Sequence, residues 1–419
     1  MGITVARDPA GGTSAGFGLL FRSLRHRNFR LFFLGQGVSL IGTWMQQTAM
    51  SWLVYRLTGS PFLLGLVGFS GQIPVFFLAP VAGFAADRWN RHRILLATQS
   101  LALVQALALS VLAFTGTLTV GHIIPLSIFM GLINAVDMPV RQAFVVEMIE
   151  RREELGNAIA LNSSLFNGAR LIGPSVAGLV VASAGEGICF LINALSFIAV
   201  IVALLSMKLR PRVPAPAASG VFESVREGFS YVFRFPPFRK VLVMLALVSL
   251  FGIPFIVLMP VIARDLLGGG ADTLGFLMGA AGLGALCGAV TLASRKGIRG
   301  LGRWIPLAAS IFGAGLVAVS FSRTLWVSLF LVAVAGFGMM VQTASSNTLM
   351  QSVADDDKRG RVMSLYTMSL VGLAPLGSLI LGSLGGKIGA PNTLIMSGVV
   401  CIAGAYIVMG RKTKKRRDT

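Results

Sequence analysis

Twelve apolar stretches of about 20 residues run along this chain, and they constrain its fold more than any other feature. A helix of about 20 residues crosses roughly 30 Å of hydrocarbon, so each stretch is long enough to span a membrane. The predicted spans are 31–55, 62–84, 94–115, 122–146, 157–182, 187–207, 240–263, 274–294, 304–321, 325–349, 362–384 and 391–410. Hydrophobic residues make up 55% of the chain and charged residues 12%, which is more apolar than a soluble domain needs. The sequence therefore predicts an all-α polytopic membrane protein.

The cations are sorted between the two sides of these spans. Among the 36 Lys and Arg residues, the loops on one side hold only Arg56, Arg264, Arg323 and Lys387. Arg170 lies inside a span, and all the others lie in the tails, in the opposite loops or at a helix end on that side. Since short loops rich in Lys and Arg stay in the cytoplasm, we expect a multi-pass protein of the cell (inner) membrane with cytoplasmic N- and C-termini. A net charge of +20 would indicate nucleic acid in a soluble protein, but beside apolar spans it favours anionic lipids at the cytoplasmic face instead.

The spans and loop lengths divide the chain into tails, bundles and a linker. These parts are a cytoplasmic N-terminal tail at 1–30, an N-terminal six-helix bundle at 31–207, a cytoplasmic linker at 208–239, a C-terminal six-helix bundle at 240–410 and a basic cytoplasmic tail at 411–419. The first tail lacks the apolar core of a cleavable signal, so we expect it to be retained. In the linker, Phe222, Val225, Phe229 and Val232 form one apolar helical face. This face indicates an interfacial helix on the inner leaflet or, equally, a simple inter-domain linker.

An internal repeat supports the division into two bundles. Glycines around the fifth span recur around the eleventh span at a shift of 204 residues: Gly156, Gly168, Gly173 and Gly178 match Gly360, Gly372, Gly377 and Gly382. Parallel six-helix repeats are typical of transporters that hold substrate near the membrane midplane between two halves. The repeat therefore predicts two pseudo-symmetric six-helix bundles around a central pathway.

The loop after the second span reads Gly83-Phe-Ala-Ala-Asp87-Arg88-Trp-Asn90-Arg91-His92-Arg93. It resembles the loop motif of the major facilitator superfamily, although Asn90 and His92 replace the glycine and the cation that are usual there. The resemblance implies the major facilitator fold and a conformational latch at Gly83, Asp87, Arg88 and Arg91. The small residue of this motif lets two helices approach, and its carboxylate suits a helix N-terminus or a cation across the bundle interface. The alternative is that the arginines only anchor the topology.

A second motif, Gly168-Ala-Arg-Leu-Ile-Gly173-Pro174-Ser-Val-Ala-Gly178, lies in the fifth span. It is similar to the Gly-Pro motif of superfamily exporters, with one glycine after the proline where a pair is usual. Because the proline removes a backbone donor and the small residues allow close packing, the resemblance implies a pivot at Gly168, Gly173, Pro174 and Gly178. Further matches lie at 57–61, 137–142, 157–158, 226–229 and 359–362. They resemble the branch of enterobactin exporters and macrolide-efflux proteins, which favours export over uptake.

Polar residues inside the spans predict the substrate and proton pathway, because such groups are costly in lipid. Arg170 lies deepest, and Asn162 and Asn167 share its helical face, where they would attract an anionic or carbonyl-rich substrate. Asp137 lies one turn before Arg141. One interpretation is a structural pair of Asp137 with Arg141 or with Arg170. The other is a carboxylate that takes up and releases a proton as access alternates.

A second set of polar residues lies on the first, tenth and eleventh spans. These candidates are Gln36, Thr43, Gln47, Gln342, Asn347 and Tyr366. In the superfamily the first and fourth helices of each half line the central cavity, so the resemblance places such side chains on the pathway. An ordinary hydrogen bond between helices is the alternative role for each of them.

Other chemistry is not indicated by the sequence. The segment 385–388 departs from the phosphate-binding loop at its last position, and Cys189, Cys287 and Cys401 lie in separate spans without metal-ligand spacing. We therefore expect no cofactor, no metal site and no enzyme. The predicted function is a monomeric, proton-coupled exporter of a small amphiphilic molecule, such as a drug-like compound or a siderophore. The alternatives are an uncoupled facilitator or importer, a lipid translocase and a non-transporting membrane receptor.

Overall fold

The computed structural model describes residues 21–149, 152–208, 235–295, 297, 300–355 and 358–409. Within these ranges the side chains at 79–88, 152, 236–237, 361 and 408–409 lie outside the description. Most of the predicted tails and the predicted linker helix also fall outside the described residues, so these parts stay predictions.

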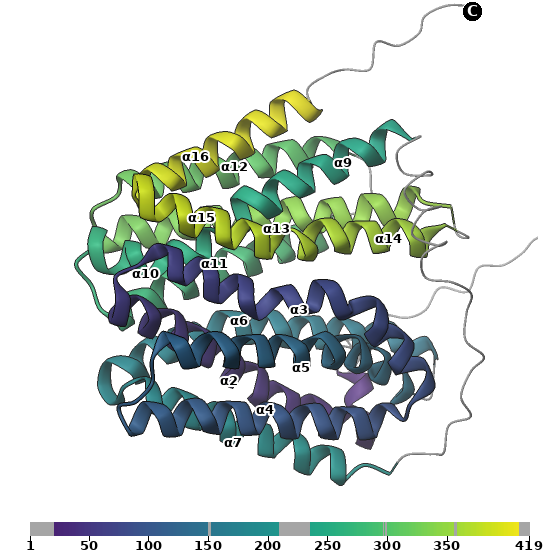
Figure 1. Ribbon diagram of the computed structural model, residues 1–419. Helices are drawn as coiled ribbons and strands as arrows, with labels where there is room; N and C mark the ends of the chain where they lie inside the picture. The colour runs from purple at the N-terminus through teal and green to yellow at the C-terminus, as the bar shows by residue number, and fades with distance from the viewer. Residues whose placement is uncertain are drawn as a thin grey trace, which may run out of the picture.

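Six long helices form the first half of the molecule, the N-half (Figure 1). They are α2 (Arg27–Thr58), α3 (Pro61–Arg88), α4 (Arg91–Phe114), α5 (Val120–Glu147), α6 (Leu155–Ala184) and α7 (Glu186–Leu205). Two short 3-10 turns, η1 (Arg22–Arg25) and η2 (Arg152–Glu154), lie at the end where the described chain begins. Ser23 Oγ donates to Glu154 O at 3.0 Å, and His26 Nε2 lies 2.7 Å from the Glu154 carboxylate. These contacts hold the start of the chain against the start of α6.

Six further helices form the C-half, residues 236–409 (Figure 1). The first runs through α9 (Pro236–Leu247), η3 (Val248–Gly252), η4 (Ile253–Leu258), α10 (Met259–Val261) and η5 (Ile262–Leu266). The next three are α11 (Ala271–Ala293), α12 (Leu301–Phe321) and α13 (Leu325–Val353). The fifth runs through α14 (Arg359–Thr367), η6 (Met368–Gly372) and α15 (Ala374–Ile388), and the last through α16 (Ala390–Gly404) and η7 (Ala405–Met409). The twelve predicted spans thus all fold as helices, and the described residues contain no strand, which confirms the predicted all-α fold class.

Helix α2 is less apolar than the other long helices. Among the described residues, eleven helices are long and apolar enough to cross a membrane, and α2 does not reach that threshold. Its polar side chains turn inward: Gln46 Nε2 donates to Gln105 Oε1 at 3.0 Å, and Asn193 Nδ2 donates to Gln46 Oε1 at 2.8 Å. Gln105 Nε2 in turn donates to Leu126 O at 3.2 Å. Because hydrogen bonds between helices satisfy these amides, α2 lies in the bundle without exposing them to lipid.

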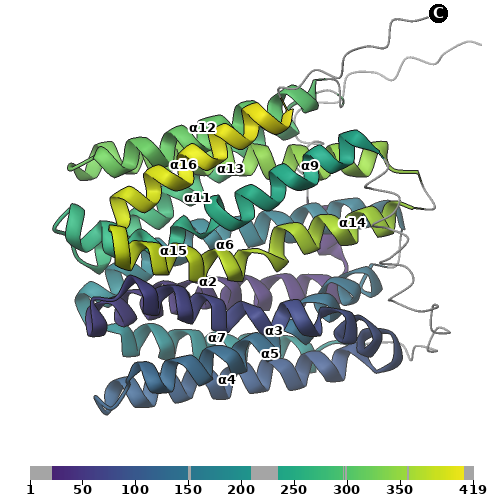
Figure 2. The ribbon, with the colours of Figure 1, turned by 45° about the horizontal axis from the view of Figure 1, so that its top comes forward.

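The two halves pack against each other through two helix pairs, α3 with α15 and α6 with α11 (Figure 2). Glycines at both crossings let the backbones approach closely. A Cβ on Gly178 of α6 would lie 2.7 Å from Ala271 O and 2.9 Å from Gly275 Cα. A Cβ on Gly382 of α15 would lie 2.7 Å from Gly65 Cα on α3. Since Gly178 and Gly382 correspond in the internal repeat, the repeat places equivalent small residues at the two crossings.

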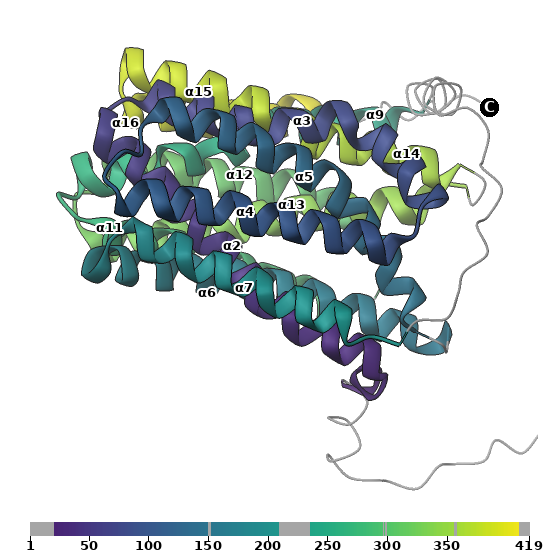
Figure 3. The same ribbon diagram turned by 60° about the horizontal axis from the view of Figure 1, so that its bottom comes forward.

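The closest contacts between the halves lie at the end of the molecule away from the two chain ends (Figure 3). At that end Tyr55 Oη donates to Asp265 Oδ2 at 2.5 Å, which joins α2 to η5. The Arg264 guanidinium carbon lies 5.9 Å from the centroid of the Tyr55 ring. Toward the other end, a Cβ on Gly168 of α6 would meet no heavy atom within 4 Å. The halves are therefore clamped most tightly at the end opposite the chain termini.

The C-half contains helical turns that depart from α geometry. Segments η3 and η6 are π-helical, and Ser249 Oγ in η3 donates to Leu370 O in η6 at 2.7 Å. A π turn leaves carbonyl groups without their usual partner, and hydroxyl side chains restore such hydrogen bonds within a membrane. The two irregular turns therefore stabilise each other inside the C-half.

Replacing Gly178 with valine should loosen the clamped end. The new side chain would meet backbone atoms of α11, which have no room to move aside, so we expect the halves to separate there. Spin labels at Thr117 and Arg323, on loops of the two halves at that end, should report longer distances in the variant. Gly168→Val is the matched control, since a Cβ there meets nothing within 4 Å. Unchanged distances in Gly178→Val, or equal changes in both variants, would contradict this role of the crossing.

Candidate functional site

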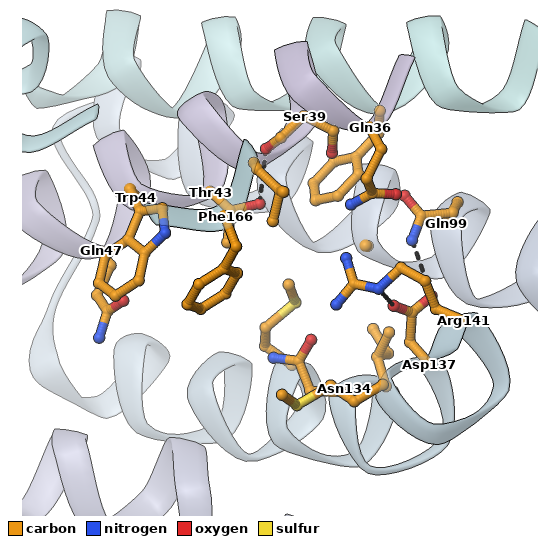
Figure 4. Close-up of a pocket in the computed structure, with 16 residues that line it drawn as sticks. Gln36, Ser39, Thr43, Trp44, Gln47, Gln99, Asn134, Asp137, Arg141 and Phe166 are labelled. Atoms are coloured by element: carbon orange, nitrogen blue, oxygen red, sulfur yellow. Dashed lines mark hydrogen bonds and ion pairs between the residues drawn. The ribbon is translucent and has the colours of Figure 1, made fainter. Parts of the chain in front are cut away.

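A cavity of about 200 Å³ lies within the N-half, between α2, α4, α5, α6 and α7 (Figure 4). Its polar wall consists of Gln36, Ser39, Thr43, Gln47, Gln99, Asn134, Asp137 and Arg141. Its apolar wall consists of Leu40, Trp44, Ala102, Met130, Ile133, Met138, Phe166 and Phe197. Apolar walls with a few convergent polar groups are typical of small-molecule sites, and this mixture suits an amphiphilic ligand.

Asp137 is the acidic group of this cavity, and three side chains surround its carboxylate. Thr98 Oγ1 and Gln99 Nε2 each donate to Asp137 Oδ1 at 2.8 Å. Arg141 Nε lies 3.4 Å from Asp137 Oδ2, one helical turn further along α5. The Asp137 side chain is 3% exposed and that of Arg141 is 19% exposed. The pair is therefore neutral as a unit, with its cation nearer to the open cavity than its anion.

Gln99 leaves one acceptor unused beside this pair. Its Nε2 donates to Asp137, but its Oε1 is buried and has no hydrogen-bond partner among the described residues. A buried polar atom without a partner costs about 1–3 kcal/mol. Gln99 lies on the same side of the cavity as Gln36 in Figure 4.

Trp44 and Phe166 form an aromatic corner on the other side of the cavity (Figure 4). Their ring centroids lie 5.9 Å apart with an interplanar angle of 70°, an edge-to-face arrangement. A Cβ on Gly173 would lie 2.5 Å from Trp44 Cβ, so this glycine makes room for α2 beside α6. The Arg170 guanidinium carbon lies 5.8 Å from the centroid of the Trp44 ring. Arg170 thus adjoins the cavity through Trp44 and is not part of its lining.

The structure brings five of the predicted pathway residues together. Gln36, Thr43, Gln47, Asp137 and Arg141 all line the cavity. Asp137 pairs with Arg141 on its own helix, as one of the two structural interpretations expects. Because the Asp137 carboxylate pairs with Arg141, it is not the ion-pair partner of Arg170.

The other predicted pathway residues lie elsewhere. On α6, Asn162 and Asn167 are partly buried, and Asn167 Nδ2 donates to Ser163 O of its own helix at 2.8 Å. In the C-half, Gln342 is fully buried and Tyr366 Oη donates to Thr343 O at 3.0 Å. Asn347 Oδ1 accepts a hydrogen bond from Gln351 Nε2, one turn further along α13, at 2.6 Å. None of these side chains lines the cavity described above.

The predicted latch is described only in part. The backbone of α3 runs through Gly83, Asp87 and Arg88, whose side chains lie outside the described residues. Arg91, at the start of α4, contacts Glu147 Oε1 at 2.8 Å, at the end of α5. This ion pair ties two helices of the same half at the end near the chain termini.

The predicted pivot lies along the contact of α6 with its neighbours. The helix runs through Pro174 without interruption, and the Pro174 carbonyl oxygen would lie 2.7 Å from a Cβ on Gly275 of α11. Gly173 faces α2 and Gly178 faces α11, so the small residues of this motif serve two different interfaces.

Sequence reasoning missed the side chains that hold Asp137. Thr98 and Gln99 were not among the candidates, since α4 has polar residues on several faces and the sequence does not tell which face points to α5. Asn134 lies one turn before Asp137, and this spacing was the signal that could have placed it on the cavity wall. Among the described residues, no group of three His, Cys, Asp or Glu side chains is arranged to hold a metal ion.

Comparison with known sequences identifies a family and several relatives. A family model described as transmembrane secretion effector matches residues 20–418. The staphyloferrin A transporter of Staphylococcus aureus is 25% identical over 394 residues, covering 93% of this chain and 98% of the relative. The multidrug efflux pump Tap of Mycolicibacterium fortuitum is 25% identical, covering 88% and 91%. The enterobactin exporter of Shigella boydii is 25% identical, covering 86% of each chain.

Solved structures share the fold at lower identity. A bacterial homologue of the human lysosomal transporter Spinster, in an inward-facing and unoccupied conformation, matches with a TM-score of 0.71 at 14% identity, covering 92% of this chain and 96% of that one. A bacterial homologue of the iron transporter ferroportin, in an inward-facing state, matches with a TM-score of 0.65 at 15% identity, covering 90% and 98%. These matches confirm the predicted two-bundle fold.

The geometry of the Asp137 pair predicts unequal effects of removing its two partners. Arg141→Met leaves a buried carboxylate without its cation and should lower the free energy of unfolding by about 3 kcal/mol. Asp137→Asn should cost about 1 kcal/mol, because the amide oxygen still accepts from Thr98 and Gln99 and Arg141 reaches the cavity. Thermal unfolding of the purified protein in detergent measures both changes.

The double variant Asp137→Asn/Arg141→Met completes a double-mutant cycle, which measures the interaction between the two residues. It should be more stable than Arg141→Met alone, because no unpaired charge remains. Additive losses in the double variant would show that the pair does not stabilise the fold.

Proposed function

Because the chain belongs to the transmembrane secretion effector family of major facilitator transporters, we propose that it is a proton-coupled exporter of small amphiphilic molecules. It works by alternating access: one site opens first to one side of the membrane and then to the other. The relatives named above include a siderophore transporter, a multidrug efflux pump and a siderophore exporter. These relatives support export of a drug-like compound or a siderophore.

The observation that carries the proposal is the cavity of the N-half. It combines carboxamide and hydroxyl groups with Trp44, Phe166 and two methionines, so it offers hydrogen bonds and apolar contacts to one ligand.

Asp137 and Arg141 supply the proposed coupling. A proton that binds Asp137 removes the negative charge that holds Arg141, and the arginine is then released toward the cavity. The released guanidinium extends into the cavity and occupies space that a substrate needs, whereas the ionised pair holds Arg141 against Asp137 and leaves that space free. Proton binding and substrate binding therefore exclude each other, which is the requirement for antiport.

The two halves supply the proposed movement. The glycine crossings close the end away from the chain termini, and opening of that end requires α6 and α11, and α3 and α15, to separate. Two of the proposed pivot residues, Pro174 and Gly178, lie against α11. We further propose that both termini face the cytoplasm of the cell membrane, that the basic loops bind anionic lipids, and that the transporter acts as a monomer.

Transport in everted membrane vesicles tests this function. The panel contains a labelled macrolide, a catecholate siderophore, a hydroxycarboxylate siderophore and a fluorescent phospholipid. Uptake of at least one of the first three should stop when a protonophore collapses the pH gradient. Asp137→Asn should lose gradient-driven uptake and most of the exchange of labelled for unlabelled substrate, because its neutral side chain mimics protonated Asp137, the state in which Arg141 occupies the cavity. Asp355→Asn, at a side chain that is 61% exposed, is the matched control and should transport normally.

Each other outcome of this experiment favours a different function. Uptake that persists without a gradient would indicate a facilitator or importer and refute antiport. Movement of the phospholipid alone would indicate a lipid translocase. Binding of one of these compounds without movement of any of them would indicate a non-transporting receptor.

The proposed latch gives a further prediction. Asp87→Asn should lower the maximal transport rate severalfold while leaving the half-saturating concentration nearly unchanged, because the latch acts on conformational change and not on binding. Initial rates over a range of substrate concentrations in the same vesicles separate the two effects. Normal turnover in this variant would remove Asp87 from the latch.

A further inference from the structure

Arg170 occupies an unusual position for a cation. It lies at the middle of α6, a helix of 30 residues, and thus about 20 Å from either end. At this point α6 crosses α11 of the C-half: a Cβ on Gly282 would lie 2.9 Å from Leu171 Cα and 3.3 Å from Arg170 O. Two residues before Arg170 and about one turn before Leu171, a Cβ on Gly168 would meet nothing within 4 Å. Arg170 therefore lies at the last close contact of this helix pair, where space between the halves begins.

The charge of Arg170 is not balanced by the protein around it. Among the described residues, no hydrogen bond or ion pair involves its guanidinium group, whose carbon lies 5.8 Å from the centroid of the Trp44 ring. The acid of the neighbouring cavity, Asp137, is held by Arg141, Thr98 and Gln99. A charged side chain this deep in a membrane protein is costly without an anion, and a cation-π contact offsets only part of that cost.

The surroundings of Arg170 indicate what kind of anion would bind. Trp44 contacts Arg170 and also lines the cavity, so a ligand in the cavity can reach the guanidinium group along the indole ring. Phe166 extends this aromatic surface. The guanidinium fork matches a planar carboxylate with two parallel hydrogen bonds. Since the Asp137 pair is neutral as a unit, the region carries a single uncompensated positive charge.

We propose that Arg170 is the anion-binding and specificity-determining residue of this transporter, and that its substrate class is the amphiphilic organic monoanion. The carboxylate binds the Arg170 guanidinium, and the aromatic or apolar part of the molecule packs against Trp44 and Phe166 inside the cavity. This assignment rests on the proposed transport function for its physiological meaning, but the binding step itself needs no gradient. A small inorganic monoanion such as chloride carries the same negative charge and is the alternative ligand of Arg170.

Binding of a matched pair of probes to the purified transporter in lipid nanodiscs tests the site. The probes are naphthoate and naphthamide, which share the aromatic part and differ in charge, and empty nanodiscs correct for partition into lipid. Wild-type protein should bind naphthoate more tightly than naphthamide. Arg170→Gln should weaken naphthoate binding by about tenfold or more, as expected for a lost charge-assisted hydrogen bond, and leave naphthamide binding nearly unchanged. Arg170→Lys should restore part of the affinity, because it keeps the charge but not the fork.

Arg323→Gln is the control for removal of a cation, because Arg323 is exposed on a loop and bonds only to the carbonyl oxygens of nearby residues. It should bind both probes as the wild type does. The thermal unfolding midpoint of each variant is measured alongside, so a folding defect is visible. Equal loss of both probes in a folded Arg170→Gln protein, no loss of naphthoate, or no naphthoate binding by the wild type would each overturn the proposal.

A second arm repeats the titration in chloride and in gluconate buffers. Similar naphthoate affinities in both support a substrate carboxylate at Arg170. Strong competition by chloride that disappears in Arg170→Gln would assign the site to a resident halide and overturn the substrate class. Because no gradient is applied, loss of coupled transport in vesicles would refute the proposed function and leave this binding result intact, and the reverse also holds.

Discussion

The interior of a membrane offers no hydrogen-bond partners, and the architecture of this protein depends on that constraint. Helix α2 carries so many polar side chains that its apolarity alone does not suffice for a span. It stays in the bundle because Gln46 shares hydrogen bonds with Gln105 and Asn193 on two neighbouring helices. The same inward turn of its polar face places Gln36, Thr43 and Gln47 on the wall of the cavity. The inward orientation of the polar face of α2 thus explains both its hydrogen bonds to neighbouring helices and the polar lining of the cavity.

Two charged side chains at the cavity, Asp137 and Arg170, differ in how their charges are compensated. Asp137 has a cation and two neutral donors, and the unit formed with Arg141 is neutral. Arg170 has an aromatic face and no acid among the described residues. A neutral pair suits a group that exchanges a proton, whereas an unbalanced cation suits a group that meets a charged ligand. Their separation by the Trp44 side chain lets one cavity serve both roles.

The two halves share an internal repeat but differ in the regularity of their helix geometry. Equivalent glycines, Gly178 and Gly382, form the two crossings that clamp one end of the molecule. The N-half holds its cavity between continuous α-helices, whereas the C-half contains the π turns joined by Ser249 and Leu370. Pseudo-symmetry therefore extends to the packing contacts between halves and stops short of the local helix geometry.

The sequence by itself determined the twelve helices and their division into two halves, because apolar length and helical spacing are local properties of the chain. Polar residues inside the spans pointed to Asp137 and Arg141, and the resemblance to the superfamily placed Gln36, Thr43 and Gln47 on the pathway. The sequence also pointed to Arg170, since a cation inside an apolar span stands out. Only the tertiary structure decided that Asp137 pairs with Arg141, that Thr98 and Gln99 hold its carboxylate, and that Gln342 and Tyr366 are buried away from the cavity. These facts depend on the rotation of each helix about its axis and on which neighbour it faces, and packing between distant parts of the chain sets both.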